Sequence, residues 1–578
     1  MAWKYSLTFV LMVLFWASPQ GNAQATAPTA TPKSAAVAPA ANTTPPTTLR
    51  GATSMDEVLD RVVAREQELV GTLANYTPMV ETYIQNLKPD HELGAVPDND
   101  RYFLGKLDLK DGVSEHSLLA EPGFGSSLRN ALTQFYAVRY LPDGFAQMML
   151  VDGKAFDRSN YNFEYVRREF LGEVRCLVFD VQPSAESTQA HFEGRIWVED
   201  QGYNIVRFNG TYNGSSVIKL YFHFDSWREN MGPGLWLPAY VYSEESDMGY
   251  FLGRRHLRFK GQTRIWGYNV GHSNAENEFT AMMVEADKVE DNGDAVEHIS
   301  PVLSFRKWER QAEDNVLQRM EKARILAPEG EVDKVLNTVV TNIEVTNNLD
   351  ITPEIRVRVL LTSPLETFSV GHTIVISRGL LDVLPDEASL AMVLAHELAH
   401  ISLGHRLDTK YAFNDRMLFD DTKTFDRLHV RRDGKEEHEA DAKAMEFLQK
   451  SPYKDKLANA GLFLRALASR SNVLPNLVSA HMGNPMAQGK NVKRMSDLVQ
   501  TAPELEPTKV EQMAALPLGG RLRVDPWSNQ LELVKTKPMA LLSAREKMPF
   551  EVTPVFLYLT RQKEPTAAAS RNNNNNNN

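Results

Sequence analysis

Two histidines and a glutamate lie close together in one apolar stretch of this chain. Residues 393–400 read Val-Leu-Ala-His-Glu-Leu-Ala-His and contain the pattern H-E-x-x-H. Residues four apart share one face of a helix, so the ring nitrogens of His396 and His400 can bind one zinc ion. Glu397 lies about 100° round the helix from His396, within reach of a metal-bound water. The pattern predicts the catalytic half of a zinc hydrolase.

An ordinary amphipathic helix with exposed histidines is the alternative interpretation. Histidine is scarce, with 14 in 578 residues, and a chance H-E-x-x-H has a probability of roughly 2% in such a chain. Apolar neighbours on most sides predict a buried helix; they are Leu390, Val393, Leu394, Leu398 and Ile401. Buried histidines and a buried glutamate need partners, and a metal would supply them.

A catalytic zinc site usually has three protein ligands and one open position for water. His405 is the nearest candidate for the third ligand. The longer motif H-E-x-x-H-x-x-G-x-x-H needs Gly at 403 and His at 406, where this chain has Leu403 and Arg406. We therefore expect His405 to end the helix, favoured there by the helix dipole, or to contact a ligand without binding the metal.

A better third ligand lies on the next helical stretch, residues 436–448. Glu437 and Asp441 are one turn apart on a stripe that then becomes apolar. Such carboxylates are costly to bury unless they are paired or bind a metal. We expect Glu437 to bind the metal and Asp441 to hold the free nitrogen of a ligand histidine. A charged helix start is the alternative, and His438 and Glu439 are second choices.

Three segments in this order resemble one group of metalloproteases. They are residues 373–382, which read Thr-Ile-Val-Ile-Ser-Arg-Gly-Leu-Leu-Asp, then H-E-x-x-H, then Glu-His-Glu-Ala-Asp at 437–441. Over residues 305–500 the chain resembles the family that contains the CAAX prenyl endopeptidases, the HtpX heat-shock membrane proteases and periplasmic BepA. The resemblance implies that His396, His400 and Glu437 bind one Zn²⁺ per chain and that Glu397 is the general base. The soluble periplasmic members are the closer analogy, because no four-helix membrane core is visible.

The chain departs from that family at two places. The family often has Asn-Ala-Phe before the strand, where residues 366–368 are Glu-Thr-Phe. It often has His-Pro followed closely by Arg. Here Pro485 comes four residues after His481, and Arg494 comes later still. His481 and Arg494 are therefore candidates for stabilising the transition state.

The strand before the motif is a candidate substrate-binding strand. Thr373, Val375 and Ser377 alternate along it, and a strand beside a zinc cleft can bind an extended peptide by main-chain pairing. Residues 406–435 carry many charges and scattered aromatics, which indicates either a lid or a solvated loop.

The first 25 residues are typical of a secretory signal. Lys4 precedes an apolar run, residues 5–17, that is too short to span a bilayer, and small-residue cleavage sites follow it. The single cysteine, Cys176, permits no internal disulfide. A bacterial periplasm, or secretion, is expected, with no transmembrane segment in the mature chain. The net charge of −11 argues against nucleic acid and anionic membrane surfaces as partners.

The fold class predicted is α+β. A helix over 58–73 precedes strands predicted at 82–85, 102–107, 146–151, 176–181, 192–198, 205–212 and 219–224, which indicates a curved antiparallel sheet or half-barrel. This part weakly resembles the LolA/LolB lipoprotein-sorting domains and implies an acyl chain or lipoprotein in a concave face; a packed domain without ligand is equally expected. A mainly helical zincin-like domain with a small sheet and a short β-rich C-terminal segment follow.

The expected organisation has six parts. They are a signal peptide (1–25), a disordered Ala/Thr/Pro linker (26–50), the β-rich domain (51–304), the metalloprotease domain (305–505), a β-rich segment (506–563) with a hairpin at 521–534 and a strand at 556–559, and a disordered tail (564–578).

The activity predicted is that of an endopeptidase acting on proteins or peptides, with envelope quality control as one role. The alternative is a non-enzymatic lipid or lipoprotein carrier, or a chaperone, in which zinc is structural. A structural zinc does not require Glu397, which favours the enzyme. A protease to which the β-rich domain presents apolar clients is a third interpretation.

Overall fold

The computed structural model describes residues 52–110, 112–119, 140–184, 190–213, 222–250, 255–268, 300–405, 430–537 and 539–562. The chain divides into Met1–Arg50 and one compact unit, Gly51–Asn578. The predicted signal peptide and linker, residues 406–429 and the tail after 562 lie outside the described residues. Among the helices that are described, none is long and apolar enough to cross a membrane.

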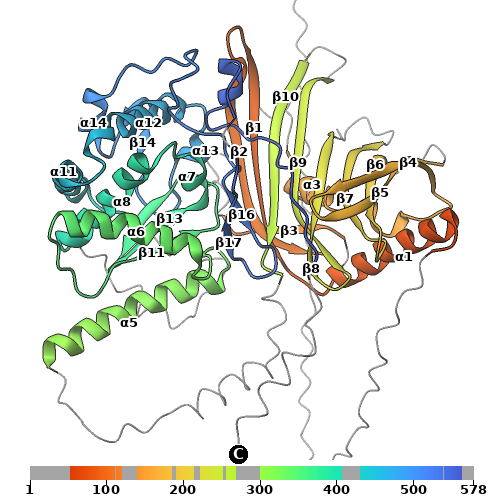
Figure 1. The fold of residues 1–578 in the computed structure, drawn as a ribbon, viewed down its shortest axis with the longest axis horizontal. Helices are drawn as coiled ribbons and strands as arrows, with labels where there is room; N and C mark the ends of the chain where they lie inside the picture. The colour runs from red at the N-terminus through yellow and green to blue at the C-terminus, as the bar shows by residue number, and fades with distance from the viewer. Residues whose placement is uncertain are drawn as a thin grey trace, which may run out of the picture. The chain divides into compact units, whose positions relative to one another are not determined.

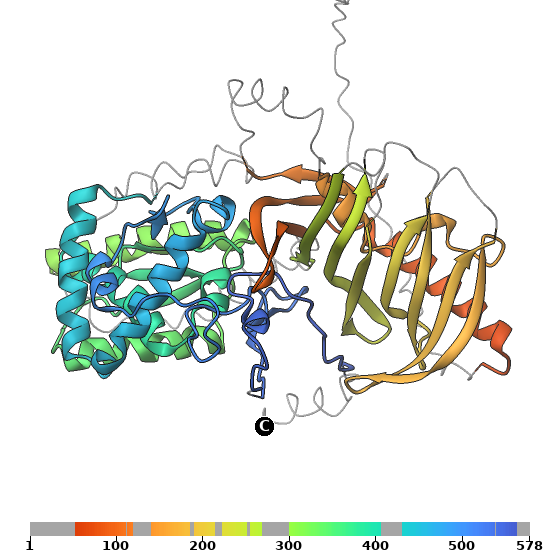
Figure 2. The ribbon, with the colours of Figure 1, turned by 90° about the horizontal axis from the view of Figure 1, so that it is seen from above.

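A ten-stranded antiparallel sheet follows the N-terminal helix, which confirms the predicted fold class (Figures 1 and 2). Helix α1 (Met55–Leu73) begins after Ser54, whose hydroxyl accepts a hydrogen bond from the Glu57 amide. The strand order is β3-β2-β1-β10-β9-β8-β7-β6-β5-β4. The strands are β1 (Met79–Asp90), β2 (Gly94–Asp108), β3 (Ser114–Ser117), β4 (Tyr161–Leu171), β5 (Val174–Pro183), β6 (His191–Glu199), β7 (Ile205–Asn213), β8 (Phe224–Gly232), β9 (Leu235–Tyr250) and β10 (Arg255–Trp266).

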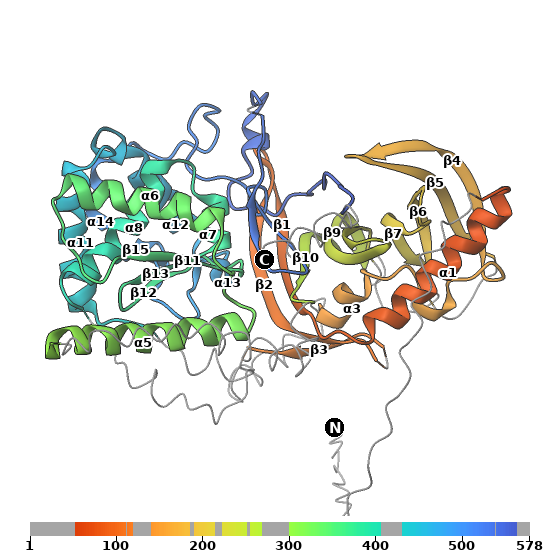
Figure 3. The same ribbon diagram turned by 60° about the horizontal axis from the view of Figure 1, so that its bottom comes forward.

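One face of this sheet packs against α1 and a short helix, α3 (Pro142–Gln147) (Figure 3). Val62 of α1 and Phe145 of α3 join Phe192 and Phe208 of the sheet in one buried cluster. The strand predicted over 146–151 is wrong, because its first residues end α3 and turns follow. Side chains of both helices fill space against this face, and binding of an acyl chain stays a prediction.

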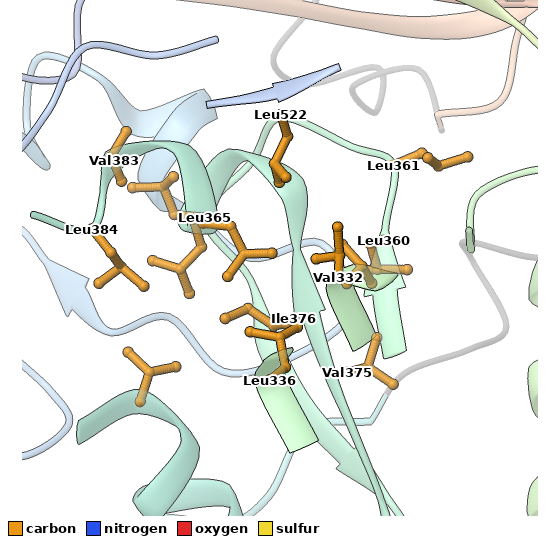
Figure 4. Packing of buried hydrophobic residues seen from close by; sticks show 14 of the residues in the cluster. Val332, Leu336, Leu360, Leu361, Leu365, Val375, Ile376, Val383, Leu384 and Leu522 are labelled. Carbon is orange, nitrogen blue, oxygen red and sulfur yellow. The ribbon is translucent and has the colours of Figure 1, made fainter. Parts of the chain in front are cut away.

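The second half of the chain surrounds a three-stranded sheet with helices. Strand β13 (Thr373–Ser377) lies between β11 (Arg356–Leu360), which is parallel to it, and β12 (Thr367–Val370), which is antiparallel. Figure 4 shows Val375 and Ile376 of β13 near Val332 and Leu336 of α6 (Glu331–Thr346), in one buried apolar cluster. The main helices are α5 (Pro301–Lys322), α6 (Glu331–Thr346), α7 (Arg378–Val383), α8 (Glu387–Ser402), α11 (Gly434–Lys450), α12 (Leu457–Arg470), α13 (Pro475–Val478) and α14 (Ser496–Thr501).

The C-terminal segment contains the predicted hairpin. Strands β16 (Leu522–Val524) and β17 (Leu531–Leu533) pair, and Asp525 accepts hydrogen bonds from the amides of Trp527 and Ser528 in the turn. The strand predicted at 556–559 is wrong. This stretch is irregular, although the Leu559 carbonyl accepts a hydrogen bond from the Glu173 amide.

A buried charged cluster joins β1 to the start of α7. Glu81 accepts hydrogen bonds from Arg378 Nη2 at 2.8 Å, Ser363 Oγ at 2.8 Å and Tyr102 Oη at 2.9 Å. Arg378 Nη1 also donates to Asp382 at 3.2 Å. Both charged ends of the Glu81–Arg378 pair are buried, with side chains 1% and 0% exposed. Each charge therefore depends on its partners in the other part of the fold.

A second buried acid makes a similar connection from β2. Asp100 accepts hydrogen bonds from the amides of Asn476 and Leu477 at the start of α13, and from Asn476 Nδ2. Tyr83 also donates to it at 3.1 Å. The first two strands of the large sheet thus hold two segments of the helical half.

Replacing Arg378 by Met should destabilise the protein by about 3–5 kcal/mol, because Glu81 keeps its buried charge and loses the guanidinium. Denaturant unfolding monitored by circular dichroism measures the change. Lys88→Ala is the control, since the Lys88–Asp98 pair is exposed and should contribute less than about 1 kcal/mol. Equal effects of the two substitutions would contradict the role given to the buried pair.

Candidate metal centre

Helix α8 carries the H-E-x-x-H pattern in a buried position. Its first turn is capped by Asp386, whose carboxylate accepts a hydrogen bond from the Ser389 amide at 2.8 Å. Apolar residues cover most sides of the helix, and His396, Glu397 and His400 are each 1% exposed. Polar groups this deeply buried require partners from other elements.

Helix α11 packs against α8 and supplies one of these partners. Asp433 caps α11 by accepting hydrogen bonds from the amides of Lys435 and Glu436 at 2.9 Å. Glu437, in the first turn, places its carboxylate oxygens 3.4 Å from His396 Nε2 and 3.5 Å from His400 Nε2. The two Nε2 atoms are 3.2 Å apart. Two imidazoles and one carboxylate therefore converge on one point.

This geometry fits a single metal ion. Ligand atoms bound tetrahedrally at about 2.0–2.1 Å lie about 3.3 Å from one another. The two Nε2 atoms are 3.2 Å apart, Glu437 Oε2 lies 3.4 Å from His396 Nε2, and Glu437 Oε1 lies 3.5 Å from His400 Nε2. Among the described residues, His396, His400 and Glu437 form a group that could hold a metal ion. The remaining position of the tetrahedron could hold a water.

The far sides of both histidine rings contact further polar groups. His396 Nδ1 lies 2.9 Å from Asp441 Oδ1, as expected for a carboxylate that orients a ligand. His400 Nδ1 lies 3.0 Å from His405 Nδ1, and His405 Nε2 lies 3.2 Å from Glu439. If each Nε2 lone pair faces a metal, each Nδ1 must carry the proton. Asp441 and His405 lie close enough to these Nδ1 atoms to favour that tautomer.

Arg494 connects the two glutamates of the site. Its Nη1 donates to Glu397 Oε1 at 2.9 Å, and its Nε lies 3.1 Å from Glu437 Oε2. Nη1 also lies 3.3 Å from the Thr367 carbonyl of β12. The guanidinium is buried and balances two carboxylates that would otherwise repel each other.

Charge, rather than burial, sets the ionisation of both glutamates. Burial raises the pKa of Glu397, but Arg494 and the two histidines outweigh it and hold that pKa below its usual value. Burial also raises the pKa of Glu437, yet hydrogen bonds from His396 and His400 bring it well below the usual range. Burial lowers the pKa of His400. It also lowers the pKa of His396, but Asp441 and Glu437 more than offset this and raise it.

The contacts of His481 are with Tyr102 and Glu366. Its ring stacks on Tyr102 with centroids 5.5 Å apart, and its amide donates to Glu366. The ion pairs of the cluster involve Arg494 instead. Arg494 thus lies where a stabilising cation could act, whereas His481 supports the neighbouring segment.

The prediction that residues 373–377 form a substrate-binding strand is wrong. Thr373, Val375 and Ser377 belong to β13, which is the central strand and pairs with β11 and β12 along its length. A strand that is paired on both sides cannot add a peptide by main-chain pairing. The edge of this sheet that packs against α8 is β12.

Asn484 also contacts the candidate site, although the sequence did not predict it. Its Nδ2 donates to Glu437 Oε1 at 2.7 Å and to the Arg432 carbonyl at 3.0 Å. Asn484 therefore fixes the direction of the third ligand. Pro485 could have pointed to this residue. The family that the sequence resembles often has His-Pro in this region, and here the residue before the proline is Asn484.

Replacing Asn484 by Ala should weaken metal binding about 10- to 100-fold, because Glu437 loses the amide that orients it. Titration of the metal-free protein with Zn²⁺ against a competing chelator measures the affinity. Asn459→Ala is the matched control, since Asn459 is exposed and donates to Asp386 at the start of α8. An affinity unchanged in Asn484→Ala would refute this role.

Glu366 should make stability depend on pH. Burial raises its pKa to about 7 from 4.5, although the amides of His481 and Met482 donate to it. The folded state thus favours the protonated form of Glu366. The contribution of this group to the free energy of unfolding is complete below about pH 4.5 and is lost as the pH rises through about 7. Glu366→Gln should gain stability relative to wild type between pH 5 and 8, by at most about 3 kcal/mol. Denaturant unfolding across this range tests it, with the exposed Glu446→Gln as a control that shows no such trend.

Comparison with known proteins found one matching family model and similar solved structures. Residues 328–419 match the model of Peptidase family M48; this range includes α8 but ends before Glu437. A solved structure of a LolA superfamily protein from Nitrosomonas europaea is similar at 11% identity and a TM-score of 0.20, over 37% of this chain and 93% of that one. No curated protein matches.

A TM-score of 0.20 carries no argument about function. The family match covers the helix in which the two histidines and Glu397 lie, and it agrees with the resemblance drawn from the sequence motifs. Residues 328–419 of this chain are therefore similar to Peptidase family M48.

Proposed function

We propose that this protein is a zinc-dependent endopeptidase that acts on proteins in the bacterial periplasm or outside the cell. The observation that carries the proposal is the triangle of His396, His400 and Glu437, with the ionised Glu397 beside it. The match of residues 328–419 to a peptidase family supports the reaction class. The apolar run near Lys4, typical of an exported protein, supports the compartment.

The donor set favours zinc. Two neutral imidazoles and one carboxylate with a fourth position for water are the ligand set of catalytic zinc sites. Magnesium and calcium prefer oxygen ligands at larger coordination numbers. The free nitrogens of both histidines have partners that fix their tautomers, as a high-affinity zinc site requires.

Bound zinc would supply a water whose pKa is lowered toward about 7 and would polarise the peptide carbonyl. Glu397 is held ionised by Arg494, so it can take a proton from the attacking water and pass it to the leaving amine. Arg494 forms ion pairs with both carboxylates. It could also donate to the oxygen on which negative charge develops.

Glu397→Gln should leave metal binding intact and lower the rate of casein cleavage by more than 10³-fold, because the amide cannot accept the proton. Metal content by atomic emission and cleavage of an unfolded casein-like substrate, with and without chelator, test this. Glu446→Gln on α11 is the control, since this exposed acid pairs with Lys443 and Lys450. Cleavage by Glu397→Gln near the wild-type rate would contradict the role of Glu397 as the general base.

A further inference from the structure

A small apolar cavity adjoins the metal centre. It encloses about 10 Å³, near the least space that holds one water molecule. His396 and Arg494 border it, and the remaining walls are mainly apolar: Thr367, Met392, Val393, Leu464, Met486 and Met495. Each of these side chains is buried.

Three of the wall residues are methionines brought together from different elements. Met392 lies one helical turn before His396 on α8. Met486 precedes a short hairpin, β14 (Ala487–Gln488) and β15 (Asn491–Val492), and its carbonyl accepts a hydrogen bond from the Lys493 amide at 2.8 Å. That hairpin returns the chain beside Met486 at Arg494 and Met495. The β14–β15 hairpin thus positions Arg494, which bridges the two glutamates, and also Met486 and Met495, which line the cavity.

Met495 adopts a strained conformation at this place. Its φ is 55°, in the left-handed region that is unfavourable for a residue with a side chain. The conformation lets the chain turn from the hairpin into α14 while Arg494 points to Glu397 and Met495 stays buried. Strain of this kind persists where surrounding structure requires one arrangement of a site.

A peptide cleaved at this centre must place its scissile carbonyl within a few ångströms of His396, His400 and Glu397. One side chain flanking that bond must then lie beside His396. The cavity provides apolar space there, and methionine side chains are flexible enough to shift by small amounts around a ligand. The walls leave room for a small group in the packing observed.

We propose that this cavity receives one of the two side chains flanking the scissile bond, and that Met392, Met486 and Met495 restrict it to small residues such as Gly, Ala and Ser. The inference rests on the proposed peptidase function. It assigns a substrate preference to side chains that bind no metal.

The test is a peptide library cleaved by the full-length zinc-loaded protein, with cleaved bonds identified by mass spectrometry. Wild type should favour a small residue at one of the two flanking positions. Met486→Ala enlarges the cavity, so kcat/KM for a peptide with Leu at that position, relative to Ala, should rise about tenfold. Met320→Ala is the matched control, a buried methionine of α5, and should keep the wild-type preference.

The outcomes separate this inference from the proposed function. If wild type shows no chelator-sensitive cleavage, both are overturned. If it cleaves but shows no preference for small residues, or if folded Met486→Ala keeps the wild-type preference, the cavity assignment alone is overturned. Should Met486→Ala fail to fold by circular dichroism, Leu464→Val provides the same readout with a smaller deletion on α12.

Discussion

The burial of α8 is the constraint on which the rest of the site depends. The helix is apolar around most of its surface, and yet it carries two imidazoles and a carboxylate that are each 1% exposed. An unpaired buried charge costs several kcal/mol. The surrounding elements therefore supply charged groups that compensate for these buried side chains. Glu437 and Asp441 come from α11, and Arg494 comes from the segment before α14.

The same principle extends to the large sheet. Glu81 and Asp100 are buried acids on β1 and β2, and their partners are Arg378, Ser363 and Asn476 in the helical half. Tyr102, which donates to Glu81, also stacks on His481. The segments that precede β12 and Asn484 are consequently fixed by groups of the sheet. The geometry of the candidate metal centre thus depends on Glu81 and Asp100, which lie about 300 positions before His396 in the chain.

Sequence patterns located the elements with local signals. The spacing of His396 and His400 and the stripe of Glu437 and Asp441 are properties of single helices, so they could be read directly. Asn484 and the pairing of Arg494 could not, because they reach Glu437 through a hairpin and loops whose path depends on the whole fold.

Errors in the sheet have equally physical causes. The run at 146–151 is apolar and short, which does not distinguish a strand from the end of a buried helix such as α3. Strand β10 was missed because Gln262 and Arg264 are polar, although both are buried against other parts of the chain. Strand β13 was identified correctly, but its central position depends on β12, whose Thr-Phe-Ser-Val sequence gave no separate signal.

The arrangement around Glu397 bears on whether the metal would be structural or catalytic. A structural site needs its ligands and their supporting partners, and here those are His396, His400, Glu437 and Asp441. Glu397 lies outside that set, is buried, and is kept ionised chiefly by Arg494. Burying this additional ion pair brings little net stability, since desolvation of both charges offsets most of their attraction. A base beside the residues that would hold the metal gives the pair a catalytic role, and this favours a peptidase over a carrier that contains zinc.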